Sequence, residues 1–217
     1  MAKQYDRSDS KVEVTGFEAR NYDLMMNLIT GGTYPFFIRR AIKEMSINPE
    51  DRILILGSGT GRNTSLIQKY LSAQGEILGL DIGEEMLEQA HHSFRHFPNI
   101  TFKKQRIDEP LPYKDEFDKV FISFVLHGFI QEDRLKIISN AHRALHSSGE
   151  FIILDYNEFD PAKSSWLVQF IFKMECPLAT DFVLRDWQST LKENGFDDFL
   201  KYPHYFGYVQ LLKSSKL

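Results

Sequence analysis

"RILILGSGTGRNTSLI", residues 52–67, is the stretch that decides the fold of this chain. An aliphatic run, typical of a strand buried on both faces, leads into Gly57, Gly59 and Gly61 and then into a segment with helical spacing. Glycine lacks a β-carbon, so the chain can turn tightly there and a ligand can approach the backbone. A turn of this kind lies at the carboxyl edge of a parallel sheet, where nucleotide-like ligands bind.

Outside this stretch, strand-like and helix-like segments alternate. Such alternation predicts an α/β fold, doubly wound, with a mostly parallel sheet covered by helices on both faces. The last two strand-like segments, 196–202 and 205–213, are joined only by "PH" and are expected to be antiparallel neighbours. The other expected strands are 52–57, 76–81, 100–105, 117–123 and 149–156, and the expected helices are 62–73, 83–94, 131–145 and 184–196.

Composition and charge narrow the class of protein. The chain has 217 residues, a formal net charge of −4 and a sequence pI near 6.0, so no nucleic-acid partner is expected. Its one cysteine, Cys176, cannot form an internal disulfide, which favours a reducing compartment. The first 20 residues have no apolar core typical of a secretory signal, and no apolar stretch is long enough to span a bilayer. We expect a soluble, cytoplasmic protein.

The spacing of the glycines points to one kind of nucleotide ligand. A dinucleotide-binding loop has its third glycine one position later, where this chain has Arg62. A nucleoside without a pyrophosphate is therefore favoured. Asp81 ends the next strand, where an acid accepts hydrogen bonds from the hydroxyls of a ribose.

Four stretches together resemble the class I S-adenosylmethionine-dependent methyltransferases: "ILILGSGTGRNT", "ILGLDIGEEMLEQA", "FDKVFISFVLHGF" and "HSSGEFIILDY". The resemblance implies a Rossmann-like, seven-stranded sheet with an antiparallel last strand, and S-adenosyl-L-methionine as the cofactor. Upstream, "ARNYDLMMNLITGGTYPFFIRRAI" is similar to the N-terminal helices of the ubiquinone and menaquinone C-methyltransferase group. We expect one methyltransferase domain over 1–217, with an N-terminal helical lid at 1–48 and a substrate-side insertion at 157–184.

The resemblance also assigns roles around the glycine loop. Gly57, Ser58, Gly59 and Gly61 would approach the methionine half of the cofactor through their backbone. Asp81 would hold the ribose.

Further cofactor contacts come from other parts of the chain. Ile82 and Met86 would pack near the adenine, and Asp108 is the candidate acceptor for its amino group. Ser123 would lie beside the sulfonium, and Tyr22 would close over the cofactor carboxylate.

Methyl transfer depends mainly on positioning and on exclusion of water, and a base is needed only if the acceptor must lose a proton. His127 is the best candidate for that base, and a structural histidine that caps the following helix is the equal alternative. His91, His92 and His96 have no acid or cysteine that would complete a metal site, so no metal is expected.

Aromatic residues mark a region that could receive the methyl acceptor. They would form either ordinary core or the cover of an apolar acceptor pocket, and both alternatives stay open. These residues are Phe159, Trp166, Phe170 and Phe172 in the insertion, and Tyr34, Phe36 and Phe37 near the N-terminus.

The sequence therefore predicts a methyltransferase that acts on a C or O nucleophile of a small, apolar or aromatic acceptor. Two other functions remain open. One is a nucleotide-dependent oxidoreductase of similar architecture, and the other is a protein that binds S-adenosylmethionine without catalysis.

Overall fold

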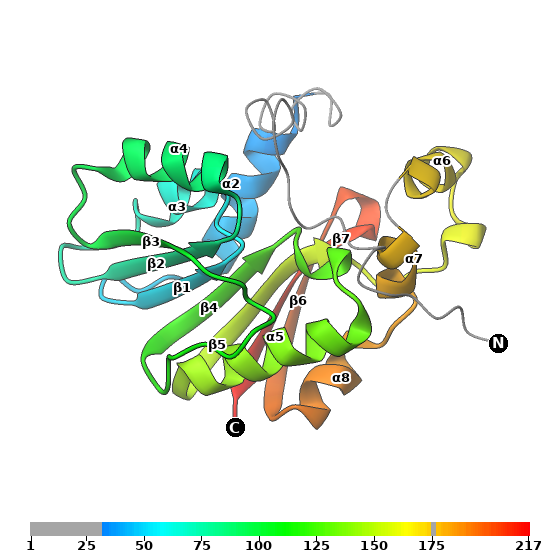
Figure 1. The fold of residues 1–217 in the computed structure, drawn as a ribbon. Coiled ribbons are helices and arrows are strands. Elements are labelled where there is room, and N and C mark those ends of the chain that lie inside the picture. The colour runs from blue at the N-terminus through cyan, green and yellow to red at the C-terminus, as the bar shows by residue number, and fades with distance from the viewer. Residues whose placement is uncertain (1–31, 175–176) are drawn as a thin grey trace.

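A computed structural model describes residues 32–174 and 177–217, and the prediction for Tyr22 lies outside this part of the chain. Its centre is a seven-stranded sheet in the order β3-β2-β1-β4-β5-β7-β6 (Figure 1). β7 runs opposite to the other six strands of this sheet, so the predicted fold is confirmed. The strands are β1 (Arg52–Leu56), β2 (Glu76–Asp81), β3 (Ile100–Lys104), β4 (Phe117–Ser123), β5 (Leu145–Tyr156), β6 (Phe196–His204) and β7 (Val209–Lys216).

Alternate residues of the central strands enter two separate cores. In β1, Ile53 and Ile55 belong to one core, while Leu54 and Leu56 belong to the other, and all four are almost fully buried. Burial on both faces explains why this strand is an unbroken aliphatic run. It also makes the carboxyl end of β1, where the glycines follow, a rigid platform.

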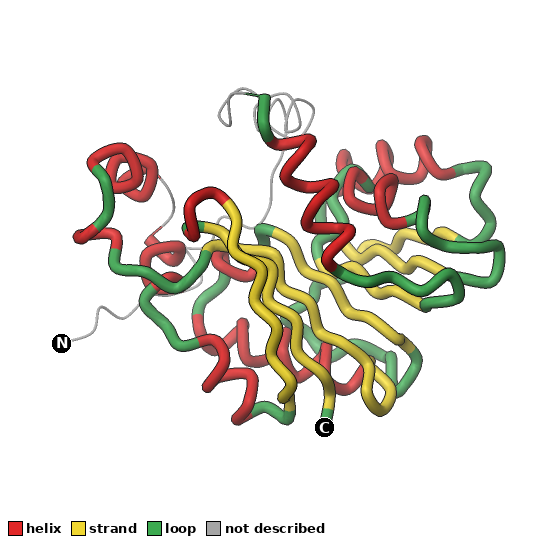
Figure 2. Tube along the Cα trace, turned by 180° about the vertical axis from the view of Figure 1, so that it is seen from behind, coloured by secondary structure: helices red, strands yellow, loops and turns green. Residues whose placement is uncertain are grey.

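Helices cover both faces of the sheet, as the two views in Figures 1 and 2 show. One core contains residues of α2 (Tyr34–Glu44), α3 (Arg62–Ile67) and α4 (Glu84–Phe94). The other contains residues of α5 (Gln131–Ala144), α6 (Trp166–Met174), α7 (Pro177–Val183) and α8 (Trp187–Glu193). Among the described residues, no helix combines the length and the apolar character that crossing a bilayer requires.

Two expected helices are shorter than the sequence pattern suggested. α3 ends at Ile67, and not at residue 73, because the next amides bond three residues back in tighter turns, such as the Tyr70 amide to the Ile67 carbonyl at 3.0 Å. α8 begins at Trp187, three residues later than predicted, because the Asp186 side chain accepts from the Ser189 amide and caps the helix there. It ends at Glu193, three residues before the end of the predicted range 184–196, because Asn194 is its C-cap and Gly195 follows with a φ of 86°.

The C-terminal strands also differ in their limits. Pro203 and His204, expected to join the two strands, belong to β6, and the turn lies at Tyr205–Gly207. A proline is tolerated in β6 because this is an edge strand. β5 begins at Leu145, earlier than the predicted residue 149, with a register shift against β4.

Candidate functional site

The glycine loop connects β1 to α3, and its three glycines have positive φ angles: 74° at Gly57, 54° at Gly59 and 80° at Gly61. A β-carbon at Gly57 would lie 2.6 Å from Val125, and one at Gly61 would lie 2.7 Å from Phe94. At Gly59 nothing lies within 4 Å. Gly57 and Gly61 are therefore required by packing, whereas Gly59 leaves open space above the loop.

Asp81, the last residue of β2, ties this loop to the neighbouring strand. One carboxylate oxygen accepts from the Gly59 amide at 2.7 Å and the other from the Gly83 amide at 2.9 Å. Each carboxylate oxygen has two lone pairs, so capacity is left for the hydroxyls of a ligand. The backbone thus fixes the carboxylate in place before any ligand binds.

Asp108 lies in the loop after β3 and is buried, with its side chain only 3% exposed. The loop is anchored by Asn140 of α5, whose amide group donates to the carbonyls of Ile107 at 2.9 Å and Glu109 at 2.7 Å. Arg106 donates to the Asp108 carboxylate at 2.8 Å.

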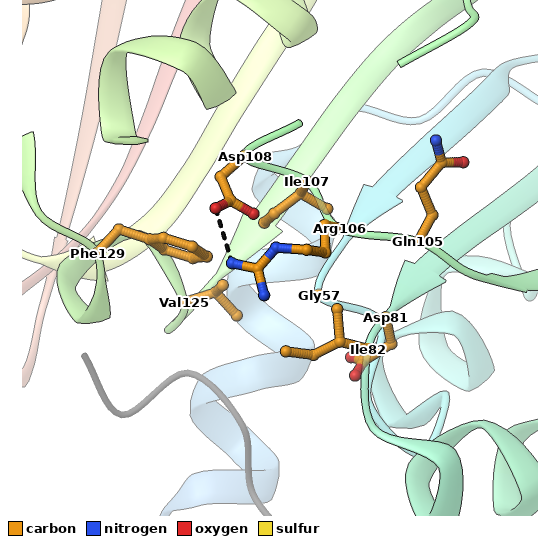
Figure 3. A pocket seen from close by; sticks show the side chains of 9 residues that line it. All are labelled: Gly57, Asp81, Ile82, Gln105, Arg106, Ile107, Asp108, Val125 and Phe129. Atoms are coloured by element: carbon orange, nitrogen blue, oxygen red, sulfur yellow. Dashed lines mark hydrogen bonds and ion pairs between the residues drawn. The ribbon is translucent and has the colours of Figure 1, made fainter. Parts of the chain in front are cut away.

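These residues surround a small cavity of about 40 Å³ (Figure 3). The sequence-predicted residues Gly57, Asp81, Ile82 and Asp108 line it, although they come from three different segments of the chain. The other lining residues are Gln105, Arg106, Ile107, Val125 and Phe129.

The remaining predicted cofactor residues lie around this cavity but do not line it. Met86 is buried in α4, close to Gly83. Ser58 is buried with its side chain near Gly79, and its hydroxyl has no hydrogen-bond partner among the described residues. Ser123 is the partly buried last residue of β4.

His127 lies in η2, a single 3-10 turn (Leu126–Gly128) that follows β4. Its Nδ1 lies 2.7 Å from a carboxylate oxygen of Asp155, and its backbone amide donates to the other oxygen at 3.2 Å. Asp155 is 1% exposed in β5. The N-cap of α5 is Ile130, so His127 does not cap that helix and the capping alternative is wrong. A carboxylate on Nδ1 favours the tautomer whose lone pair is on Nε2.

Arg134 of α5 supports this turn from behind. Its fully buried guanidinium donates to the carbonyls of Leu126 at 3.2 Å and His127 at 3.0 Å, and also to Leu178 of α7 at 2.8 Å. It forms an ion pair with Asp181 at 2.6 Å. Burial acts to raise the pKa of Asp181, but hydrogen bonds from Arg185 and Arg134 outweigh it and hold that pKa below its usual value.

Aromatic rings surround the imidazole. The ring of Tyr156 lies 5.0 Å from His127 and 5.0 Å from Phe172 of α6, and Phe159 lies 5.2 Å from Phe172. The segment 157–184 adds Phe182, whose ring lies 6.4 Å from His127, and Phe172, which contacts Tyr156. The other five aromatics singled out in the sequence lie elsewhere: Trp166, Phe170 and Phe36 are exposed, and Tyr34 and Phe37 pack in the opposite core.

A family model of the methyltransferase domain matches residues 47–196, more than two thirds of the chain. The chain belongs to the methyltransferase-domain family. This membership, together with the relatives and solved structures below, confirms the predicted resemblance to class I S-adenosylmethionine-dependent methyltransferases and decides against the oxidoreductase.

The methyltransferase domain is similar to the ubiquinone/menaquinone biosynthesis C-methyltransferases UbiE of two bacteria. It is 31% identical over 140 residues to that of Wigglesworthia glossinidia brevipalpis, covering 63% of this chain and 55% of the relative. It is 30% identical over 158 residues to that of Vibrio campbellii, covering 70% and 60%. The chain thus spans 55–60% of the length of these curated relatives.

Solved structures share the fold of this methyltransferase domain at lower sequence identity. A SAM-dependent methyltransferase from Aquifex aeolicus superposes with a TM-score of 0.63 at 17% identity, covering 83% of this chain and 89% of that one.

Arg62 replaces the third glycine of a dinucleotide-binding loop. Its guanidinium lies 4.4 Å from the ring centroid of Tyr34.

The residues present fit S-adenosylmethionine. The methyltransferase domain offers open space above Gly59, a carboxylate at Asp81 with acceptor capacity, and a second buried carboxylate at Asp108. The sequence analysis missed Arg106, Arg134 and Asp155. An acid within the apolar run "FIILDY" was the one available signal, because a buried charge needs a partner.

Proposed function

We propose that this domain transfers a methyl group from S-adenosylmethionine to a C or O nucleophile of a small aromatic acceptor, with His127 as the general base. The observation that carries this proposal is the contact of His127 Nδ1 with the carboxylate of the buried Asp155 at 2.7 Å, beside the rings of Tyr156, Phe172 and Phe182. A base that is held by a buried carboxylate inside an apolar cluster suits the removal of a proton from an aromatic acceptor.

The cofactor site of the proposal is centred on the cavity beside the glycine loop. Asp81 would accept from the ribose hydroxyls, Ile82 would pack on the adenine, and Asp108 would accept from the adenine amino group. Gly57 lines the same cavity, and Gly59 offers the backbone surface next to it. These assignments rest on the shared lining of one cavity by three chain segments.

Four further cofactor contacts are proposed from the family resemblance alone. The backbone of Ser58 and Gly61 would approach the methionine half of the cofactor, and Met86 would pack near the adenine. Ser123 would lie near the sulfonium.

The two parts of the site meet at η2. Val125 and Phe129, which flank this turn, line the cofactor cavity, and His127 is carried by the turn itself. The proposed base and the proposed cofactor site therefore share one short segment of backbone.

Bound S-adenosylmethionine supplies an electrophilic methyl group. The aromatic cluster excludes water and orients the acceptor ring behind that methyl group. His127 accepts the proton that the nucleophilic oxygen or carbon loses, at Nε2, and later releases it to solvent. Asp155 holds the imidazole in the required tautomer and stabilises the imidazolium that forms.

The two UbiE relatives favour carbon as the nucleophile of this proposal. Both UbiE relatives are C-methyltransferases of quinone biosynthesis, and a hydroquinone ring has a nucleophilic carbon next to an ionisable hydroxyl. We therefore place a hydroxylated aromatic ring first among the acceptors of this domain.

The test is a methyl-transfer assay with a set of acceptors. Purified protein is mixed with S-adenosylmethionine and, separately, a naphthohydroquinone, a catechol or an aliphatic amine, and S-adenosylhomocysteine and the methylated product are measured. We expect turnover with the hydroxylated rings and none with the amine. A protein that binds the cofactor and yields no product with any acceptor supports the non-catalytic alternative.

Two variants test the base. We expect His127→Gln to lower kcat at least about 100-fold while cofactor affinity is unchanged. Asp118→Asn, which changes a carboxylate paired with His146 at the start of β4, is the matched control and should retain full activity. Unchanged kcat in His127→Gln at all pH values would show that the transfer needs no base at this position.

A further inference from the structure

The cavity at the proposed adenine position is too small for the ligand. Its volume is about 40 Å³, whereas sites for small ligands usually measure roughly 300–1,000 Å³. Figure 3 shows why: the Arg106 side chain extends across the space between Asp108 and Ile82, with Val125 and Phe129 beside it. The Arg106 side chain therefore occupies space next to the Asp108 carboxylate.

Two acids contact Arg106 in the part of the chain that the structure describes. Its Nη2 donates to the Asp108 carboxylate at 2.8 Å, and its Nε lies 3.6 Å from the Glu109 carboxylate. The Arg106 side chain is 44% exposed, whereas that of Asp108 is only 3% exposed. The arginine can thus swing toward solvent, while the aspartate cannot follow it.

We propose that Arg106 is a gate and a specificity-determining residue for the adenine subsite. Adenine enters only when the Arg106 side chain leaves Asp108, and its amino group then replaces the guanidinium as the donor to that carboxylate. The proposal rests on the proposed placement of adenine at Asp108.

The replacement of the Arg106 guanidinium by the adenine amino group explains how the gate selects the nucleobase. A buried carboxylate without a donor is costly, so the open state is favourable only when the entering base supplies a hydrogen-bond donor. The amino group of adenine is such a donor. The carbonyl oxygen that hypoxanthine carries at the same position is an acceptor and would face the carboxylate unfavourably.

Calorimetric titration with S-adenosylhomocysteine tests the gate without any acceptor or turnover. We expect Arg106→Met, which keeps an unbranched apolar stem, to bind roughly three- to tenfold more tightly than the wild type, because the ligand no longer competes with the ion pair. Unchanged or weaker binding by Arg106→Met would overturn the proposal, and weaker binding would show that Arg106 stacks on the adenine instead.

The salt dependence of S-adenosylhomocysteine affinity is a second test of the gate. S-adenosylhomocysteine carries no net charge at neutral pH, so salt acts mainly on the Arg106–Asp108 pair. Raising the salt from 0.05 to 0.5 M should tighten binding to the wild type about twofold and leave Arg106→Met unchanged. The gate is contradicted if salt does not change the affinity of the wild type and Arg106→Met also binds S-adenosylhomocysteine no more tightly than the wild type.

Three further comparisons test whether a change in affinity comes from the Arg106–Asp108 contact. Lys104→Met removes a nearby positive charge that pairs with the exposed Glu84, and it should leave affinity unchanged. In an Asp108→Asn background, the gain from Arg106→Met should disappear. S-inosylhomocysteine should bind the wild type at least tenfold more weakly than the adenosyl compound.

The experiments distinguish failure of the Arg106 gate from failure of the proposed placement of adenine at Asp108. If Asp81→Ala weakens binding of S-adenosylhomocysteine but Arg106→Met does not strengthen it, the placement stands and the gate is wrong. If Asp81→Ala and Asp108→Asn both leave affinity unchanged, the cofactor binds elsewhere and the placement itself is wrong.

Discussion

Two carboxylates at the same edge of the sheet are held in different ways. Asp81 is fixed by backbone amides, those of Gly59 and Gly83. Asp155 also accepts from two backbone amides, those of His127 and Tyr156, but it contacts the His127 imidazole as well. The carbonyl of His127 accepts in turn from Arg134. Among the described residues the donors to Asp81 are backbone amides alone, whereas Asp155 adds an imidazole and, behind it, the Arg134 guanidinium. The cofactor side is therefore robust to changes of side chain, whereas the proposed acceptor side depends on each member of its network.

The largest effect is expected from Arg134→Met. The variant removes one donor from each of three backbone carbonyls and removes the positive charge that pairs with Asp181. We therefore expect the free energy of unfolding to fall by about 3 kcal/mol, measured by urea denaturation. Arg185→Met is the control, because Arg185 pairs with the same aspartate but is one-third exposed. Equal losses in the two variants would show that the carbonyl contacts of Arg134 do not matter.

The next prediction separates the two carboxylates by function. Asp81→Asn should weaken S-adenosylhomocysteine binding roughly 10- to 100-fold, because the amide loses acceptor capacity for the ribose. Asp155→Asn should lower kcat about 100-fold and leave that affinity within twofold, because it affects only the imidazole. Titration calorimetry and steady-state kinetics measure both variants. A loss of cofactor affinity in Asp155→Asn would mean that the two regions are not independent.

The glycine loop offers a smaller contrast within the cofactor side. Gly61→Ala places a β-carbon 2.7 Å from the Phe94 ring at a φ of 80°, so we expect a loss of about 2–3 kcal/mol of folding stability. Gly59→Ala meets open space and should cost only about 1 kcal/mol for its positive φ, but its methyl group would occupy the space above the loop and weaken cofactor binding. Thermal unfolding with and without S-adenosylhomocysteine measures both effects. Stronger ligand stabilisation of Gly59→Ala than of the wild type would contradict this assignment.

The smallest effect is the pH dependence of stability from a pair near the starts of β4 and β5, His146 and Asp118. Hydrogen bonds to the Ser147 carbonyl and to Asp118 raise the pKa of His146. Its stabilising contribution is therefore fully present below the unfolded pKa of about 6.5 and is lost as the pH rises through the higher folded value. Because the pair is partly exposed, we expect a change of under about 0.5 kcal/mol between pH 6 and 8. His146→Gln should flatten this part of the stability profile, and a profile identical to that of the wild type would contradict the pairing.

The cofactor half of the molecule could be predicted from the sequence because its determinants are local. The glycine spacing, the acid at the end of β2 and the aliphatic β1 each follow from short-range rules of backbone conformation and burial. Gly57, Asp81, Ile82 and Asp108 lie around one cavity, as expected for a shared site. Their contact with the cofactor itself stays a prediction.

The acceptor half could not be predicted in the same way. Asp155 lies 28 residues from His127, and Asp181 lies 47 residues from Arg134, so no local pattern joins them. Propensity also misplaced the ends of α3 and α8, because hydrogen bonds outside the helical pattern set these limits. Arg106 looked like an ordinary polar residue at the end of β3, and only the structure places its side chain across the cavity.

The outer strand β6 carries a further consequence. Pro203 lacks a backbone donor, and a register shift between Asp197 and Leu200 interrupts the regular ladder with β7. Both features disfavour the addition of another strand at this edge, since an incoming chain would find a missing donor and an irregular backbone. The interrupted strand thus disfavours strand addition at the β6 side of the sheet, and no residue of the proposed active site takes part in this.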